Sequence, residues 1–185
     1  RDSRSTTTRT RTRVPELPEV ESAVRRLRRA LVGRRIVEVK LLHPALRRRL
    51  SPARARSLRG STVARVERHG KHQLVHLADG RVVHAHFRMT GDWAIDTVSD
   101  ELPRFARAAI SLDDGTRVVL DDPRALSTLD VHLANAAPAL GLGPEPSDPA
   151  LTAASLHEAF VKRRGPIKPV LLDQRVIAGL GNIYA

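Results

Sequence analysis

Two Asp-Gly dipeptides, each set between short apolar runs, constrain the fold of this chain most strongly. The first joins residues 74–77 to residues 82–86, and the second joins residues 110–112 to residues 118–120. Asp-Gly favours the tight turns of β-hairpins, because both of its residues adopt positive φ with little strain. The sequence therefore predicts two antiparallel hairpins.

A helix and a further strand are expected before the hairpins. Apolar residues recur at helical spacing from Pro18 to Leu31, arginines fill the other faces, and Gly33 follows as a stop signal. Residues 37–41 then alternate between apolar and charged types, which is typical of a half-buried strand. Residues 44–60 are basic and show a second, short helical pattern.

A proline- and glycine-rich stretch at residues 138–150 predicts a linker. We therefore expect one domain over residues 15–137 and the start of a second over residues 151–185. The chain stops where a further helix would be expected to begin, and its last helices could not bury their apolar faces alone. We interpret the sequence as a C-terminally truncated fragment.

Within the second part, Ser155 and Glu158 have the spacing of a capping box, which predicts that a helix begins there. A break at Gly165 precedes a second short helix around residues 170–174. A glycine-rich tight turn is expected at residues 179–182.

The charge of the chain favours a polyanionic partner. The net charge is +12, and half of the 32 basic residues lie between Arg25 and Lys71 with only two acids among them. Binding to phosphates releases counterions, which favours association with nucleic acid. A solvated, arginine-rich surface is the alternative.

Several classes of protein are excluded or disfavoured. No apolar run is long enough to cross a bilayer, and no signal peptide is visible, so we expect a cytoplasmic protein, associated with the nucleoid through DNA binding. The absence of cysteine excludes disulfides and cysteine-ligated zinc in this chain.

The run PELPEVE at residues 15–21 carries the most specific chemistry. A free N-terminal proline is a secondary amine, so Pro15 could attack a sugar carbon and hold it as an iminium. Glu16 beside it could transfer protons. An upstream peptide bond would remove this chemistry, because an amide nitrogen is not a nucleophile.

Fourteen residues precede Pro15 in the sequence. The chain has 28 arginines and only 4 lysines, as expected from a GC-rich gene, and such genes often begin at GTG. We therefore expect translation to start at Val14 and residues 1–13 to be a spurious extension. The alternative is a genuine, disordered basic tail.

Three motifs occur in order along the chain. PELPEVE is the first, and the second is Gly70-Lys71 before a hairpin that ends HFRMTG at residues 86–91. The third is LLDQRVIAGLGNIYA at residues 171–185. Together they resemble the formamidopyrimidine-DNA glycosylases, bacterial repair enzymes that excise oxidised purines. The resemblance implies an α+β fold: an N-terminal two-sheet β-sandwich with flanking helices, then a partial helix–two-turn–helix DNA-binding domain.

The resemblance implies a DNA glycosylase with abasic-site lyase activity, a monomer that binds damaged double-stranded DNA and no membrane. Pro15 matches the nucleophile and Glu16 the proton-transfer acid. Lys71 matches a hairpin lysine that meets the DNA backbone and takes part in elimination; a solvated turn lysine is the alternative. Glu19 matches a helper carboxylate, although an acid in the first helical turn is also favoured by the helix dipole.

The resemblance also implies DNA contacts. Met89 matches a residue inserted into the duplex to fill the gap left by the flipped base, with core packing as the alternative. The positions that match phosphate contacts are His86, Arg124, Arg164, Lys168 and Asn182. Their alternatives are a strand-face histidine, surface cations and a helix cap.

Residues 122–127, DPRALS, depart from the family's DPRRFG. A second arginine is missing, and Leu126 replaces an intercalating phenylalanine. A histidine before the second hairpin is also lost, and Arg107 is its candidate replacement. These changes put lesion choice and the reading of the opposite base in doubt, but not the covalent chemistry.

The family's zinc finger and lesion-recognition loop would lie beyond Ala185. One zinc ion is therefore implied for the full-length protein, and no cofactor for this chain. A non-catalytic relative that binds damaged DNA is the rival interpretation if Pro15 is not a free N-terminus. A generic nucleic-acid-coating protein would explain the charge but not PELPEVE.

Overall fold

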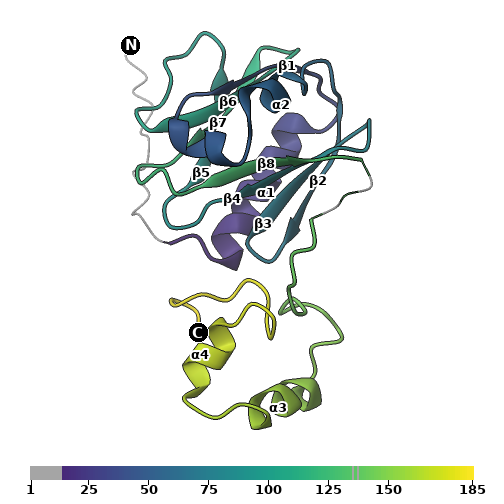
Figure 1. Ribbon diagram of the computed structural model, residues 1–185, viewed down its shortest axis with the longest axis vertical. Coiled ribbons are helices and arrows are strands. Elements are labelled where there is room, and N and C mark those ends of the chain that lie inside the picture. The colour runs from purple at the N-terminus through teal and green to yellow at the C-terminus, as the bar shows by residue number, and fades with distance from the viewer. Residues whose placement is uncertain (1–13, 135, 137) are drawn as a thin grey trace, which may run out of the picture.

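The computed structural model describes residues 14–185 except 135 and 137, so the predicted extension at residues 1–13 lies outside the described residues. A β-sandwich forms the larger part of the molecule, and a smaller part with two short helices follows it (Figure 1). The α+β class and the two-sheet sandwich are therefore confirmed.

Two four-stranded antiparallel sheets form the sandwich, with orders β1-β6-β7-β5 and β2-β3-β4-β8. The first contains β1 (Ile36–Leu41), β6 (Ala106–Leu112), β7 (Thr116–Asp121) and β5 (Asp92–Thr97). The second contains β2 (Val63–His69), β3 (His72–Leu77), β4 (Val82–His86) and β8 (Thr128–His132). Both predicted hairpins are present, because β3 pairs with β4 and β6 with β7.

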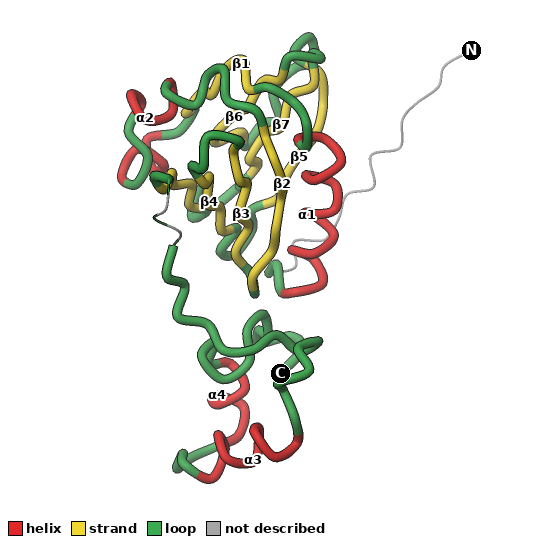
Figure 2. The backbone as a smooth tube through the Cα atoms, turned by 90° about the vertical axis from the view of Figure 1, so that its right-hand side faces the viewer, coloured by secondary structure: helices red, strands yellow, loops and turns green. Residues whose placement is uncertain are grey.

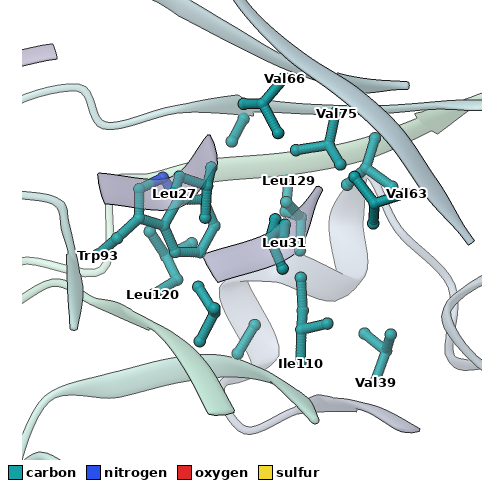
Figure 3. Packing of buried hydrophobic residues seen from close by; sticks show 14 of the residues in the cluster. Leu27, Leu31, Val39, Val63, Val66, Val75, Trp93, Ile110, Leu120 and Leu129 are labelled. Atoms are coloured by element: carbon teal, nitrogen blue, oxygen red, sulfur yellow. The ribbon is translucent and has the colours of Figure 1, made fainter. Parts of the chain in front are cut away.

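The helix α1 (Leu17–Leu31) closes one open side of the sandwich. It packs against β2 and β5, which are edge strands of the two sheets. Its apolar stripe, including Val24, Leu27 and Leu31, is buried within the core cluster (Figure 3). Fully burying such a side chain stabilises the fold by about 1.5–3 kcal/mol, so this stripe fixes α1 against both sheets.

Two short helices cover the opposite side: η1 (Pro44–Arg48) and α2 (Pro52–Arg56). The helix α2 packs against β1, and Arg54 donates a hydrogen bond of 2.5 Å to the carbonyl of Val131 on β8. The strands β1 and β8 are the remaining edges, so helices flank both open sides, as Figure 2 also shows for α1 and α2.

The smaller part contains α3 (Ala153–Val161) and α4 (Ile167–Leu172). The predicted capping box was misplaced: Thr152 is the N-cap, and its side chain accepts from the Ser155 amide at 3.1 Å. Glu158 pairs instead with Lys162 at 2.6 Å, one turn later. Thr152 offers the same acceptor three residues earlier, so the helix begins before Ser155. Among the described residues, no helix is long and apolar enough to cross a membrane.

Candidate active site and DNA-binding surface

Glu16 lies at the point where the sandwich meets the smaller part. Its side chain is buried immediately before α1. The carboxylate accepts hydrogen bonds from the backbone amides of Ile183 at 2.7 Å and Tyr184 at 3.3 Å. Burying a carboxylate is costly unless donors meet it, so these amides are what make the position tolerable. The bonds join residues from opposite ends of the described chain.

Glu19 completes this contact. One carboxylate oxygen accepts from the Glu16 amide at 3.1 Å, and the other accepts from the Tyr184 hydroxyl at 3.2 Å. Glu19 therefore lies in the first helical turn and is partly buried beside Glu16, and its role as a helper carboxylate stays a prediction. Pro15 is buried directly before Glu16, and in this chain its nitrogen is bonded to Val14.

Lys71 occupies the turn between β2 and β3 and points toward the smaller part. Its Nζ donates to the carbonyl of Leu180 at 2.6 Å. Burial lowers the pKa of Lys71, and the nearby negative charge of Glu16 partly offsets this shift. Lys71 is therefore half-buried and electrostatically coupled to Glu16, rather than a solvated turn lysine.

The glycine-rich turn of the smaller part must approach α1 closely. The Leu17 amide donates to the Gly179 carbonyl at 3.2 Å. A Cβ at Gly179 would lie 2.4 Å from the Leu17 Cδ1, and one at Gly181 would lie 2.4 Å from the Glu16 Cδ. Gly179 also has φ +95°, which favours glycine. The third motif thus owes its glycines to the contact with PELPEVE.

Gln174 supports this turn through two hydrogen bonds. Its Oε1 accepts from the Gly179 amide at 2.9 Å, and its Nε2 donates to the Leu180 carbonyl at 2.7 Å. The same carbonyl accepts from Lys71, so Gln174 helps to position the acceptor of the lysine. The sequence analysis did not single out Gln174, because a glutamine carries no local signal of such a role.

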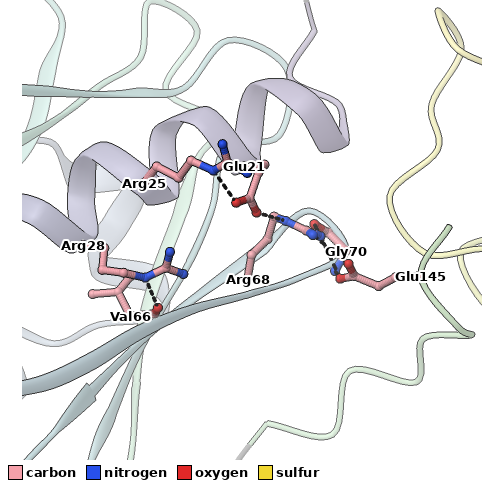
Figure 4. Close-up of polar contacts among 7 residues, drawn as sticks. All are labelled: Glu21, Arg25, Arg28, Val66, Arg68, Gly70 and Glu145. Atoms are coloured by element: carbon pink, nitrogen blue, oxygen red, sulfur yellow. Dashed lines mark hydrogen bonds and ion pairs between the residues drawn. The ribbon is translucent and has the colours of Figure 1, made fainter. Parts of the chain in front are cut away.

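A partly buried ion pair ties the predicted linker to the sandwich (Figure 4). Arg68 on β2 donates to both carboxylate oxygens of Glu145 at 2.7 and 2.6 Å, and to Glu21 on α1 at 2.7 Å. The Gly70 amide also donates to Glu145 at 2.6 Å. Glu145 therefore anchors the linker beside the turn that carries Lys71. Sequence analysis missed this pair because its members are 77 residues apart.

Met89 and Leu126 project from two neighbouring loops. Their side chains are 39% and 43% exposed, so Met89 is not a core residue. Each follows a residue with positive φ, Arg88 at +59° and Ala125 at +52°. Positive φ is uncommon outside glycine and marks loops whose conformation is enforced by their surroundings.

Asp122 enforces it. Its carboxylate accepts from the Thr90 hydroxyl, from the Leu126 amide at 2.7 Å and from the Ser127 amide at 2.7 Å. Burial opposes ionisation of Asp122, but the hydrogen bonds from Thr90 and Ser127 outweigh it and lower its pKa below the usual range. The Ser127 hydroxyl reaches the Phe87 carbonyl at 3.0 Å, so the two loops form one unit.

Arg107 supports the same unit. Its guanidinium donates to the carbonyls of Asp122 at 2.6 Å and Pro123 at 3.2 Å, and Arg124 beside them is exposed. His86 lies half-buried at the end of β4, where its Nδ1 accepts from the Arg88 amide at 3.0 Å. Burial and nearby positive groups lower the pKa of His86 to about 3.

The remaining predicted positions lie in the smaller part. Lys168 on α4 donates to the Asn182 carbonyl at 3.2 Å, and both residues are exposed. Arg164 is exposed between α3 and α4. The structure thus brings Glu16, which directly follows Pro15, and Lys71 together at the turn and places Lys168 beside Asn182, whereas Arg164 is not joined to either group.

The resemblance assigns its zinc ion to a finger beyond Ala185, so the implied zinc stays a prediction for the full-length protein. Within the described part of the chain, no group of three or more histidine, cysteine, aspartate or glutamate side chains could hold a metal.

Comparison with known proteins finds family models that match both parts of the chain. The model of the formamidopyrimidine-DNA glycosylase N-terminal domain matches residues 14–129, and the model of the formamidopyrimidine-DNA glycosylase H2TH domain matches residues 142–185. The formamidopyrimidine-DNA glycosylase of Rhizorhabdus wittichii is 40% identical over 175 residues, and that of Moorella thermoacetica is 39% identical over 179. The alignments cover 92% and 93% of this chain but only 64% and 65% of those relatives.

The solved structures agree. The Lactococcus lactis enzyme bound non-covalently to DNA containing an abasic site has a TM-score of 0.85 and 26% identity, covering 92% of this chain and 66% of that one. The two family models together span both parts of the described chain, and the motifs of the site lie within them. The chain therefore belongs to the formamidopyrimidine-DNA glycosylase family.

Proposed function

We propose that the protein is a bifunctional DNA glycosylase and abasic-site lyase that excises oxidised bases from double-stranded DNA. The observation that carries this proposal is the convergence of Pro15, Glu16 and Lys71 against the glycine-rich turn of the smaller part. The family, and the Lactococcus relatives solved with abasic-site DNA and with Fapy-dG-containing DNA, support it.

The proposed chemistry begins at the nitrogen of Pro15. As a free secondary amine it attacks C1′ of the damaged nucleotide, and a new C–N bond forms as the bond from C1′ to the base breaks. The proton that the amine loses goes to the departing base, and Glu16 protonates the ring oxygen O4′ as the C1′–O4′ bond breaks, so that the nitrogen lone pair forms the iminium. A base at the site then takes the C2′ proton, and its electron pair expels the 3′ phosphate and nicks the strand, with Lys71 beside the DNA backbone.

The lowered pKa of Lys71 supports its part in this sequence. Burial makes its ammonium a stronger acid than a solvated lysine, so the side chain gives up a proton more readily. Its bond to the Leu180 carbonyl holds Nζ in place before DNA arrives. Pre-organisation of this kind is much of the value of a catalytic group.

The DNA-binding surface is proposed to include both parts of the molecule. Met89 and Leu126 fill the space left by the flipped base, since both are exposed and apolar. The proposed phosphate contacts are His86, Arg124, Arg164, Lys168 and Asn182. Arg107 contributes by holding the loop that carries Leu126, because its guanidinium is engaged with that loop's carbonyls.

The proposal requires that Pro15 be a free N-terminus. Borohydride trapping on abasic-site DNA tests this with two forms of the protein, one beginning at Pro15 and one retaining residues 1–14. We expect a covalent complex only with the first form. Pro15→Gly should retain part of the trapping, because a primary amine also forms an imine. Equal trapping by a form shown by mass to retain residues 1–14 would refute the role of Pro15.

DNA binding without trapping by the Pro15 form would favour the non-catalytic relative instead.

Lys71→Ala tests the second member of the site. We expect nicking to fall by about 10²-fold or more, in the range of a lost general acid or base. Lys40→Ala is the matched control, because Lys40 is exposed and pairs with Glu38 on the far sheet. A large fall in melting temperature alongside the loss of nicking would mean that Lys71 acts structurally.

A further inference from the structure

Four histidines form a continuous series on the outer face of the sheet β2-β3-β4-β8. Ring centroids are 4.6 Å apart for His86 and His72, 5.0 Å for His72 and His84, and 5.6 Å for His84 and His132. The strand register places His72 directly opposite His86, so the series starts beside Lys71 and crosses the sheet to its edge strand β8. Their neighbours in sequence, such as Val83, are buried on the inner face.

Two of the rings, those of His72 and His84, are hydrogen-bonded as well as packed. His72 Nδ1 and His84 Nε2 lie 2.8 Å apart, and one proton lies between these two nitrogens. His86 Nδ1 accepts from the Arg88 amide, which leaves its Nε2 as the protonated, donating nitrogen. The Nε2 of His132 is buried without a protein partner.

The charges that face this series are mostly positive. Arg88, after β4, acts on His72, His84 and His86, and Arg49, after η1, acts on His84. Lys71 acts on His86 and His69 on His72. The acid that faces His84 is Asp130 on β8, which itself lies 3.9 Å from Arg54.

Burial and the positive neighbours hold the rings of His72, His84 and His86 neutral, and Asp130 opposes this effect only at His84. The pKa of His72 and of His84 is lowered from 6.5 to about 4, by burial first and by positive neighbours next, and that of His86 is lowered to about 3. An anion has the opposite effect, because it favours the protonated ring. Exposed charges interact over about 10 Å at moderate salt, so a phosphate at His86 would act on His72 and His84 too.

We propose that His72 and His84 continue the phosphate-binding surface of His86 across the sheet and take up protons when the DNA backbone docks there. The inference rests on the proposed function, since DNA is the ligand. Arg49 and Arg88 supply permanent charge that attracts the phosphates, and the protonated imidazoles then donate charge-assisted hydrogen bonds. The surface gains charge only when a polyanion covers it.

Proton uptake is measurable directly. Isothermal titration with a duplex carrying an abasic-site analogue, in two buffers of different ionisation enthalpy at about pH 6, gives the number of protons bound with DNA. We expect about one proton per complex, falling toward zero at about pH 8. Undamaged duplex should show the same linkage at weaker affinity, because the backbone and not the lesion is the ligand.

Histidine variants identify the side chains that take up protons when DNA binds. His84→Gln and, separately, His72→Gln should lower the uptake, whereas His157→Gln, on the exposed surface of α3, should leave it unchanged. Melting curves of each variant confirm folding, and two separate replacements guard against a single misfolded one. DNA binding with no proton uptake, or with uptake equal in wild type and both variants, would overturn this inference and leave the proposed function standing. Absence of DNA binding at about pH 8 would overturn the proposed function as well.

Discussion

Backbone amides and glycines define the surroundings of Glu16. Its carboxylate takes hydrogen bonds from the main chain at Ile183 and Tyr184, so the path of the chain matters there more than the side chains. That path passes Gly181, where there is no room for a Cβ beside Glu16. A single methyl group at this position is therefore a sharp test of the geometry.

Gly181→Ala should impair the site. Its Cβ would force Glu16 or the turn to move, and a displacement of about 1 Å can cost about 10²-fold in rate. Borohydride trapping should fall by that order with a modest loss of melting temperature. Gly33→Ala is the control: it adds a Cβ in open space at a positive φ, and should cost stability without changing trapping. Unchanged trapping in Gly181→Ala would show that the contact is not needed.

The histidine series predicts acid sensitivity. Because the pKa of His84 falls from 6.5 to about 4 on folding, the unfolded chain binds more protons between these values. Stability is full above about pH 6.5 and declines as the pH falls toward 4. His84→Gln should reduce the loss between about pH 7 and pH 5 by about 1–2 kcal/mol, allowing for partial exposure. Denaturant unfolding at the two pH values measures it, and an unchanged difference would contradict the assignment.

At the scale of elements, most local signals were read correctly, although α4 (Ile167–Leu172) begins before the range expected around residues 170–174, and the long-range contacts were not foreseen. The two hairpins and α1 follow from dipeptides and periodicity, and each is present. The start of α3 was misplaced because Thr152 and Ser155 offer equivalent caps. Of the site, PELPEVE and Lys71 were identified by resemblance. The partnership of Arg68 with Glu145 could not be foreseen, because only the tertiary fold brings them together.

The loops at residues 87–91 and 122–127 should behave as one element. Asp122→Ala would leave the Ser127 and Leu126 amides without their acceptor, at a cost of about 1–3 kcal/mol for each buried donor. We expect both Met89 and Leu126 to lose their fixed positions, so affinity for abasic-site DNA should fall more than in Leu126→Ala alone. Equal affinities in the two variants would mean that the loops are independent. Melting temperatures separate this effect from unfolding.

At the scale of the whole molecule, the linker is a fixed connection rather than a loose one. Arg68, Gly70 and Glu145 hold it against the sandwich, and the turn at Gly179 docks on α1. The smaller part therefore carries the Leu180 carbonyl to Lys71 in a defined position. Relative motion of the two parts requires that both contacts break.

Glu145→Gln should loosen this connection. The variant removes the charge of Glu145 and leaves Arg68 paired with the charge of Glu21 and bonded to the Gly70 carbonyl. Breaking a partly buried pair costs about 1–3 kcal/mol in such a partly compensated case. Limited proteolysis should then cut residues 138–149 faster and release a resistant sandwich. Glu158→Gln, which removes an exposed pair on α3, is the control. Cleavage at the wild-type rate would show that Glu145 does not restrain the linker.

The hydrogen bond between Glu16 and the Ile183 amide spans 167 residues of sequence. During synthesis, the residues of PELPEVE leave the ribosome long before the turn that completes their site. Contacts this distant form late, because the loop between them must close first. The sandwich therefore folds before the surroundings of Glu16 are complete, and Glu16 obtains its hydrogen-bond donors only when the last segment docks. The time at which the Ile183 amide becomes protected from hydrogen exchange would date this docking relative to the folding of the sandwich.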